Sequence, residues 1–349
     1  MTHRFPIKEI ARQAGLGTAT VDRTLNNRAH VSPQTKARVA AAIGELEAME
    51  AQLAARGRRM FVDVVVEAPQ RFSNQIRAAC EAVLPDLVEA VYRPRFRFQE
   101  VMTEDELLSR FARIKKRGSQ GVVLKARDNA LVVDAVNDLV RCGIPVATLV
   151  TDIPGSNRCA YVGIDNDKAG RTAAYLMARI LGDQPATILT SRSQKDFQGE
   201  EVRLVSFRNQ LNLIRPGDTV LELVGGAGLE RQTKLHLDRV ISAPTQIHAV
   251  YSMGGGNRAI LGALAEVNSP RPQFIAHDLD AENLALLRGG SVGFVLHHDL
   301  LQDMRRAFRA LSIEHGLLSP QALPPSSDIQ IVTPENIPRL RQASPDRRH

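Results

Sequence analysis

The sequence predicts an α/β protein in which an N-terminal head of three helices precedes a larger, two-lobed body built on parallel sheets. Three observations predict this architecture. Two short helical segments joined by a glycine open the chain. From Phe61 onward, short apolar runs alternate with amphipathic helical stretches, which is the pattern of βαβ units. The alternation restarts after residue 165, which indicates two similar lobes in a chain whose 349 residues exceed one ordinary domain.

The head begins with two helices around a tight turn. Gly15 ends the first helix, and a second helix is expected over Thr18–Leu25, with Val21 facing back toward the first. Two short helices joined in this way form the helix-turn-helix module, whose second helix lies in the DNA major groove. The first helix carries an apolar stripe at helical spacing, made of Ile7, Ile10, Ala11 and Ala14.

A third helix and a connector complete the head. Ser32 is a suitable N-cap and Pro33 suits the first helical position, so a helix is expected from there to Leu46. Residues 47–59 are alanine-rich and predict a connector that is helical in part. We expect a DNA-binding head with its connector over residues 1–59, an effector-binding and dimerisation body over 60–337, and a flexible tail over 338–349.

The body is expected to contain two parallel sheets with helices between most of the strands. Helices are predicted at residues 73–92 and 128–142. Ligands in such folds bind beyond the carboxyl ends of the strands, which places a binding cleft between the lobes. The predicted strands are Phe61–Val66, Gly121–Leu124, Ile144–Val150, Tyr161–Ile164, Ala186–Leu189, Thr219–Val224, Ala249–Ser252, Gln273–Ala276 and Val292–Leu296.

Positive charge is concentrated at the two ends of the chain. The net charge is +7, and residues 1–60 hold 10 Lys and Arg against 5 Asp and Glu. The last 12 residues hold 4 Arg against 1 Asp, so the middle of the chain is close to neutral. A basic head suits a polyanionic partner, whereas a nearly neutral body does not indicate nucleic-acid binding.

The remaining composition indicates a protein of the cytoplasm. Cys80, Cys142 and Cys159 are odd in number and form no C-x-x-C pair, so we expect buried thiols rather than disulfides. No apolar leader opens the chain and no run of eighteen apolar residues occurs in it. Neither secretion nor insertion in a membrane is therefore expected.

The head motif resembles the LacI/GalR family of bacterial transcriptional repressors. The motif runs Ile7-Lys-Glu-Ile-Ala-x-x-Ala-Gly-Leu-Gly-x-x-Thr-Val-x-Arg-x-Leu-Asn26, followed by His30-Val-Ser-Pro-x-Thr-Lys36. The body is similar to periplasmic sugar-binding proteins at Ile144–Pro154 and Tyr161–Gly170. The resemblance implies a ligand-responsive, non-enzymatic regulator without cofactor or metal. It would bind palindromic operator DNA as a homodimer, with a sugar, polyol or related metabolite as effector.

The resemblance also implies which head residues meet DNA. Thr18 and Ala19, at the start of the second helix, would read bases, and Arg23 could reach a phosphate or a guanine edge. The alternative for the two threonines is a cap and an exposed helix position, and for Arg23 a solvated helix face. The six predicted contacts are Thr18, Ala19, Thr20, Arg23, Asn26 and His30.

The head departs from the family pattern at three places. Asp22 stands where a small hydroxyl residue is common, so it must repel phosphates or pair with Arg23 or Arg12. Gly17 replaces a frequent serine and removes a side-chain cap.

The third departure is in the connector. The family usually has an aromatic-x-Pro-Asn segment there, and a leucine that wedges into the minor groove. An ungapped alignment puts Gly57 at the wedge position and leaves Leu53 as a substitute.

The resemblance of the body assigns the effector site. Carboxylates and arginines form paired hydrogen bonds with vicinal hydroxyls, and a ligand that lacks a hydroxyl leaves such groups unpaired. The chain has no Trp, so stacking on a sugar ring falls to Phe72. For Asp278 and Arg203 the alternative is an interlobe salt bridge or a hinge contact. The six predicted effector contacts are Phe72, Asp152, Arg203, Asn257, Asp278 and His298.

Three other functions compete with a regulator. A nucleotide-using enzyme is disfavoured because Gly225-Gly-Ala-Gly228 lacks the third glycine of a dinucleotide motif, Arg231 standing in its place. His297 and His298 are adjacent in an extended segment and point to opposite sides, which disfavours a shared metal ion. A sugar-transport solute-binding protein would not bind an operator, and an architectural DNA-binding protein would not respond to a ligand. A small molecule that changes specific DNA affinity distinguishes a regulator from both.

Overall fold

The computed structural model describes residues 4–26, 28, 31–240, 246–267 and 270–338, and for residues 48–57 the description is of the backbone only. The described chain divides into two compact units. One comprises residues 1–60 with 86–92, and the other comprises residues 61–85 with 93–349. The predicted tail lies almost wholly outside the described residues, since these end at position 338.

The first unit contains the three predicted head helices: α1 (Ile7–Ala14), α2 (Thr18–Leu25) and α3 (Pro33–Gly57). Gly15 ends α1 with a left-handed φ of 60°, a conformation that glycine adopts without strain. The Thr35 backbone N–H donates to Ser32 Oγ over 3.1 Å, which confirms the predicted cap of α3. The core of this unit consists of Phe5, Ile10, Ala11, Val21, Val39 and Leu46.

The third helix is longer than the sequence predicts. It continues through the predicted connector as far as Gly57, instead of giving way to a partly helical segment after Leu46. The alanine-rich composition explains this, because alanine is the best helix former. The side chain of Leu53, the proposed substitute for the minor-groove wedge, lies outside the described part of the chain.

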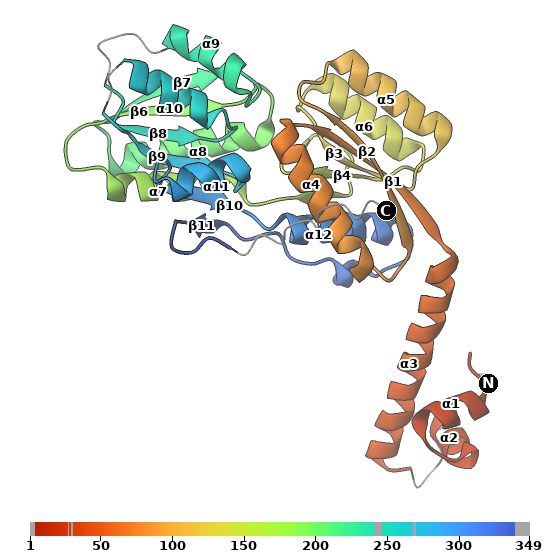
Figure 1. Cartoon of the computed structure of the whole chain (residues 1–349). Helices are drawn as coiled ribbons and strands as arrows, with labels where there is room; N and C mark the ends of the chain where they lie inside the picture. The colour runs from red at the N-terminus through yellow and green to blue at the C-terminus, as the bar shows by residue number, and fades with distance from the viewer. Residues whose placement is uncertain (1–3, 27, 29–30, 241–245, 268–269, 339–349) are drawn as a thin grey trace, which may run out of the picture. The chain divides into compact units, whose positions relative to one another are not determined.

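The first lobe of the body is a five-stranded sheet with strand order β2-β1-β3-β4-β5. Helices α5 and α6 cover one face, and α4 and α12 cover the other (Figure 1). The strands are β1 (Arg59–Glu67), β2 (Val91–Gln99), β3 (Gly121–Lys125), β4 (Val146–Leu149) and β5 (Ala160–Val162). The helices are α4 (Gln70–Val83), α5 (Glu104–Arg117), α6 (Ala130–Arg141) and α12 (Leu300–Glu314), with short 3-10 turns at Leu84–Asp86 and Pro320–Ala322.

The second lobe is a six-stranded sheet with strand order β11-β10-β9-β8-β6-β7. All its pairs are parallel except β10 with β11, where Val295 lies opposite Val332. The strands are β6 (Thr187–Arg192), β7 (Thr219–Val224), β8 (Ala249–Ser252), β9 (Gln273–His277), β10 (Phe294–His297) and β11 (Gln330–Val332). The helices are α7 (Asn166–Ile180), α8 (Gln198–Ile214), α9 (Glu230–Val240), α10 (Asn257–Glu266) and α11 (Ala281–Arg288).

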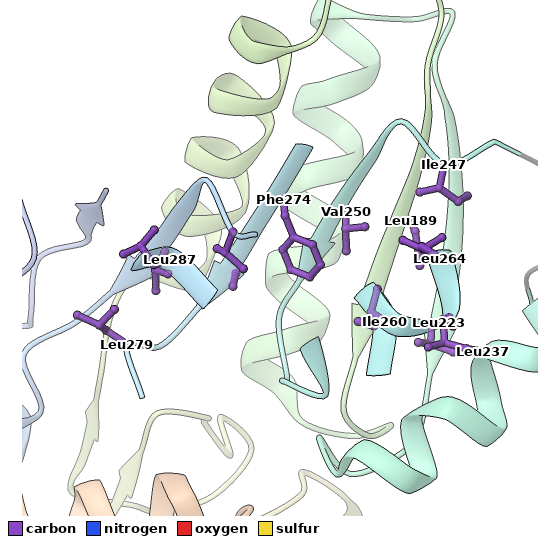
Figure 2. Packing of buried hydrophobic residues seen from close by; sticks show 14 of the residues in the cluster. Leu189, Leu223, Leu237, Ile247, Val250, Ile260, Leu264, Phe274, Leu279 and Leu287 are labelled. Atoms are coloured by element: carbon purple, nitrogen blue, oxygen red, sulfur yellow. The ribbon is translucent and has the colours of Figure 1, made fainter. Parts of the chain in front are cut away.

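Each face of the second sheet has its own hydrophobic core. Side chains of α9, α10 and α11 meet one face, and Figure 2 shows Phe274 and Val250 of the sheet among them. Phe207 and Met177, from α8 and α7, fill the opposite face together with Tyr251. Two helical layers around a mostly parallel sheet confirm the predicted α/β class.

Two predictions for the body are wrong. The predicted helix over residues 73–92 ends at Val83, and the edge strand β2 begins at Val91. That strand contains the segment Arg93-Pro-Arg-Phe-Arg-Phe98. Because arginines interrupt its apolar residues, it is not an apolar run and was not predicted as a strand. Buried thiols were expected, but Cys142 is exposed and Cys159 half-buried, and all three cysteines are free. Within the described ranges, no helix combines the length and apolar character needed to cross a membrane.

Helices α7 and α8 pack closely because Gly170 has no side chain. A Cβ there would overlap the Arg203 carbonyl oxygen and lie 3.0 Å from the Phe207 nitrogen, both in the backbone of α8. We expect Gly170→Ala to destabilise the body by about 1–3 kcal/mol through overpacking, measured by urea unfolding.

Gly262, on the exposed side of α10, provides the control for this substitution. A Cβ at Gly262 meets nothing within 4 Å. Gly262→Ala should therefore stabilise the body by up to about 1 kcal/mol. Equal effects of the two substitutions would contradict the close packing of α7 on α8.

Candidate functional site

A cleft lies at the carboxyl ends of the strands of both sheets, where parallel sheets usually bind ligands. Its wall combines apolar side chains with charged ones, as small-molecule sites commonly do. Residues that end or directly follow strands of the first lobe and line the cleft are Glu67, Lys125, Val150 and Thr151. Those of the second lobe are Ser193, Met253, His277 and Asp278.

The structure brings three of the six predicted effector residues together. Phe72, Arg203 and Asp278 all line the cleft. Asn257 and His298 are buried and do not line it. Asn257 donates through its side-chain nitrogen to Asn283 Oδ1 over 2.6 Å, and Asn283 is itself a lining residue.

Asp152 lies away from this cleft. Its carboxylate forms an ion pair with Arg158 and accepts a hydrogen bond from Thr148 Oγ1 over 2.7 Å. It borders a second hollow, which the start of α7 and residues 326–329 also line. Asp152 therefore forms a structural ion pair and does not line the cleft in which Arg203 lies.

The backbone around Asp278 fixes the direction of its carboxylate. Asp278 has a left-handed φ of 64°, which is uncommon for a residue with a side chain. Its backbone N–H donates to Leu296 O over 3.0 Å, and Asn283 Nδ2 donates to its carbonyl oxygen over 2.7 Å. Such strain is found mainly at functional sites.

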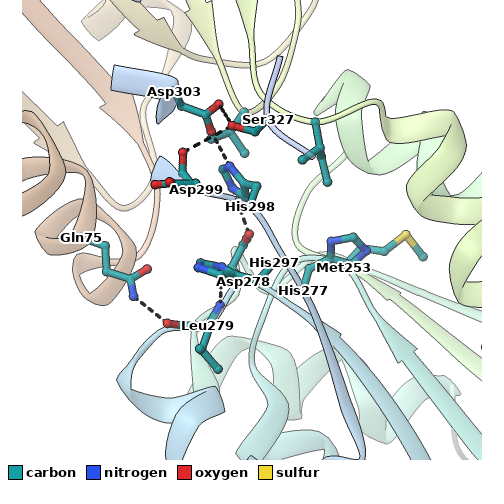
Figure 3. Close-up of polar contacts among 12 residues, drawn as sticks. Gln75, Met253, His277, Asp278, Leu279, His297, His298, Asp299, Asp303 and Ser327 are labelled. Atoms are coloured by element: carbon teal, nitrogen blue, oxygen red, sulfur yellow. Dashed lines mark hydrogen bonds and ion pairs between the residues drawn. The ribbon is translucent and has the colours of Figure 1, made fainter. Parts of the chain in front are cut away.

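A buried chain of polar groups continues behind Asp278 (Figure 3). His298 Nε2 lies 3.3 Å from Asp278 Oδ1, and the opposite ring nitrogen, Nδ1, contacts Asp303 Oδ2. Asp303 Oδ1 in turn accepts a hydrogen bond from Ser327 Oγ over 2.5 Å. His298 therefore holds the lining carboxylate in place and does not face the cleft.

These contacts make His298 a buried imidazolium between two carboxylates. Burial alone would lower the pKa of His298, but Asp303 and Asp278 raise it to about 10. Burial likewise would raise the pKa of Asp278, but the hydrogen bond with His298 and the charge of Arg203 lower it below its ordinary value. Both groups are consequently charged at neutral pH.

Two cations in the cleft have no carboxylate ion partner among the described residues. Lys125 Nζ donates to the backbone oxygen of Glu67 over 2.9 Å and lies 3.9 Å from the centre of the Phe197 ring. Burial lowers the pKa of Lys125. Arg203, only 2% exposed, donates from Nε to Asn166 Oδ1 over 2.7 Å. Both can therefore donate further hydrogen bonds to a ligand.

Two carboxylates complete the polar lining. Glu200 accepts hydrogen bonds from Ser193 Oγ over 2.6 Å and from the Ser193 backbone N–H over 2.7 Å. Glu67 pairs with Arg127 over 3.2 Å, and burial raises its pKa. In the part of the chain that the structure describes, no cluster of His, Cys, Asp and Glu is arranged to hold a metal ion.

Sequence reasoning missed several of these residues, although some carried a signal. Glu67 and Lys125 each directly follow a predicted strand, the position from which side chains reach a cleft in this fold. Arg71, Glu200 and Asn283 lie on helices. Only the packed structure shows that they line the same cleft.

The second helix of the head presents the other candidate surface. Thr18, Ala19, Arg23 and Asn26 are exposed on it, and Thr20 is half-buried. Gly17 caps this helix without a side-chain hydrogen bond, as predicted. His30 lies outside the described residues.

The expected partner of Asp22 was wrong. Asp22 pairs neither with Arg23 nor with Arg12, but with Arg28 Nη1 over 3.4 Å. Asn26 Nδ2 also donates to Asp22 Oδ1 over 2.9 Å. Arg28 therefore offsets the negative charge that Asp22 places on this surface, and Asn26 satisfies one of its carboxylate oxygens.

Two family models match the chain, one for each part of it. Residues 61–310 match the model described as "Periplasmic binding protein domain", and residues 6–47 match "Bacterial regulatory proteins, lacI family". The HTH-type transcriptional regulators TreR of Salmonella typhimurium and Escherichia coli are 30% and 31% identical to this chain over 127 residues. The matched stretch spans 36% of this chain and 39% of each relative. These matches confirm the predicted head and the predicted periplasmic-binding-protein-like body.

Solved structures share the fold of the body. GanP, a glucose-galactose binding protein from Geobacillus stearothermophilus, superposes with a TM-score of 0.70 at 17% identity, covering 80% of this chain and 99% of its own. A putative LacI transcriptional regulator from Bacteroides fragilis gives 0.67 at 16% identity, covering 80% and 98%. A solute-binding protein from Burkholderia graminis, in complex with D-arabinose, gives 0.70 at 17% identity, covering 81% and 97%. At these identities the likeness shows the fold alone.

Proposed function

We propose, on the premise that the chain belongs to the periplasmic binding protein family and carries a lacI-type head, that it is a transcriptional regulator controlled by a small molecule. Residues 1–59 would bind operator DNA in the cytoplasm, and residues 60–337 would bind the effector and form a homodimer. The observation that carries this proposal is the joining, in one chain, of an exposed recognition helix to a polar interlobe cleft.

The exposed face of α2 supports the DNA contact. Thr18 and Ala19 lie at its start and are small, so the helix can approach base edges closely. Arg23, exposed in the last turn, has the donor geometry that guanine O6 and N7 accept. Two such heads related by a twofold axis would read two half-sites of a palindromic operator.

The charge balance of the cleft supports a neutral, hydroxyl-rich effector. The cations that line the cleft are Arg71, Lys125 and Arg203, and the lining carboxylates are Glu67, Glu100, Glu200, Asp278 and Asp280. Directly behind them lie Arg127, His298 and Asp303. Five cations against six carboxylates leave little net charge for a ligand to neutralise and no excess of positive charge for an anionic ligand. Structural neighbours with this fold include a glucose-galactose binding protein and a complex with D-arabinose. We infer a monosaccharide, a polyol or a closely related metabolite.

A screen followed by DNA binding tests the proposal. Thermal shifts are measured against neutral monosaccharides and polyols, with sugar acids and sugar phosphates for comparison. The molecules that shift the melting temperature are then added to the protein on genomic DNA fragments. By linkage, an effector that changes operator affinity must itself bind more or less tightly when operator is present. Ligand binding without specific DNA binding would indicate the solute-binding alternative, and specific DNA binding without a ligand response would indicate an architectural protein.

We expect Arg23→Ala to weaken operator binding about tenfold to a hundredfold, because one bidentate contact with guanine is worth about 1–3 kcal/mol. Effector affinity should not change. The measurement is a binding titration on a fluorescent operator. Arg288→Ala, at an exposed position ending α11 in the body, removes the same charge and is the control. Equal losses in the two variants would mean that Arg23 contributes only general electrostatic attraction.

A further inference from the structure

Two glycine-rich loops border the cleft, one through Ala227 and the other through Gly254 and Gly255. Gly225, Gly226 and Gly228 have φ values of 111°, 91° and 67°, and the loop after β8 has 89° at Gly255 and 75° at Gly256. Residues with side chains rarely adopt these conformations, so the glycines are required by the backbone. The first loop follows β7 and the second follows β8, at the carboxyl edge of the second sheet.

The two loops pack directly against each other. A Cβ at Gly228 would overlap the carbonyl oxygen of Gly254, and a Cβ at Gly256 would lie 2.9 Å from Thr233 Cβ. The loops therefore meet backbone to backbone at Gly228 and Gly254, and the Thr233 side chain of α9 packs on Gly226 and Gly256. Because position 255 has no side chain, a planar group from outside can lie against the backbone there.

The side chain of Arg71 lies against this surface, although Arg71 belongs to α4 of the other lobe. A Cβ at Gly255 would overlap Arg71 Nη2 and lie 3.3 Å from Cζ. Arg71 Nε is 2.6 Å from Asp280 Oδ2, whose side chain is 6% exposed. One turn along α4, Gln75 Nε2 donates to Leu279 O over 2.9 Å.

We propose that Arg71 is the positioning residue that closes the two lobes, and that the glycine loops with Asp280 form its seat. The inference rests on the proposed function, because closure around an effector is what such a contact would regulate. The guanidinium enters the second lobe as a flat, charged group, and only glycine at position 255 leaves room for it. A lysine has the charge but not the planar fork.

The seat is negatively charged beyond Asp280. Glu282 in the first turn of α11 and Glu230 at the start of α9 lie close to each other. Burial raises the pKa of Glu282, and the charge of Arg71 opposes that rise. Arg71 of the first lobe thus contacts Asp280 and its charge acts on Glu282, both in the second lobe. This favours the closed arrangement over separated lobes.

The experiment measures the distance between the lobes in the ligand-free dimer by single-molecule fluorescence transfer. The labels are placed on Leu131→Cys of α6 and Leu235→Cys of α9, both exposed positions, with the exposed Cys142 replaced by serine. Burial raises the pKa of Cys80 and of Cys159 to about 12, so these thiols react slowly. We expect Arg71→Ala to reduce the ratio of closed to open molecules at least about tenfold.

Two further variants and a control make the result specific. Gly255→Ala keeps the charge of Arg71 but fills its seat, so it should open the lobes as Arg71→Ala does. Arg71→Lys should give an intermediate ratio. Arg77→Ala, on the same helix, removes a residue that pairs with Glu81 and stacks on Phe96, and it should leave the ratio unchanged. Thermal melting confirms that each variant is folded.

An unchanged ratio in folded Arg71→Ala overturns the inference, as does equal opening by Arg77→Ala. Because no ligand is used, this outcome is separate from failure of the proposed function. If no effector and no operator were found, the regulator proposal would fail. The effect of Arg71 on the distance between the lobes would still be measured by the same experiment.

Discussion

Replacing Asp278 by asparagine is expected to weaken effector binding about a hundredfold or more, with operator binding of the ligand-free protein unchanged. Asparagine keeps the volume and the backbone contacts of this strained position. It removes the negative charge that accepts hydrogen bonds from ligand hydroxyls and balances the imidazolium of His298. A hundredfold loss of affinity corresponds to about 2.7 kcal/mol of binding free energy. The loss of charge-assisted hydrogen bonds in a buried site has a cost of this size.

The measurement is isothermal titration with the sugar or polyol that gives the largest thermal shift in the wild-type screen. Asp105→Asn, at an exposed position in the first turn of α5, is the matched control and should bind like the wild type. If Asp278→Asn kept full affinity, the carboxylate would not contact the ligand, and the buried His298 pair would have only a structural role.

The second large effect concerns the stability of the body above neutral pH. The pKa of His298 is raised from 6.5 to about 10 in the folded protein by Asp303 and Asp278, against the effect of burial. A raised pKa stabilises the fold fully below the unfolded value and loses that contribution as the pH rises through the folded value. The contribution of His298 should therefore decline between pH 6.5 and 10, by about 1.4 kcal/mol per pH unit.

His298→Asn removes this dependence. The free energy of unfolding of the wild type, minus that of the variant, should shrink by roughly 4 kcal/mol between pH 7 and pH 10. Urea unfolding followed by circular dichroism measures it, since the chain has no Trp.

The neighbouring histidine is the control. Burial and the charge of His298 lower the pKa of His297 to about 4. The contribution of His297 to the free energy of unfolding is present above pH 6.5 and is lost as the pH falls. The difference in free energy of unfolding between the wild type and His297→Asn should therefore stay constant between pH 7 and 10. A parallel decline in both variants would disprove the buried imidazolium.

Local patterns were sufficient to predict most of the fold. Thr219–Val224 and Ala249–Ser252 were predicted with the bounds that the structure has, because each is a short run of mostly apolar residues between turns. The edge strand β2 was missed because Arg95 and Arg97 interrupt its apolar residues. Its aromatic rings are covered by arginines, Arg77 on Phe96 for instance, and this pairing exists only after folding.

The residues of the candidate site also divide into those that local sequence could indicate and those that only packing reveals. Asp278 and Lys125 follow strands, and that position alone points to the cleft, although only Asp278 was predicted. His298 was predicted as a ligand contact, but it lies behind Asp278 and does not line the cleft. Arg71 could not be found from the sequence, because its seat is formed by loops more than a hundred residues away.

The return of the chain to the first lobe has a consequence for synthesis on the ribosome. Helix α12 follows the parallel strands of the second lobe, yet it packs on α4 and places Leu311 against Gly121 of β3. A nascent chain therefore cannot finish the first lobe until nearly all of the second has emerged. Until then the first sheet lacks the part of its cover that α12 provides, and a chaperone that holds exposed apolar surface would bind there.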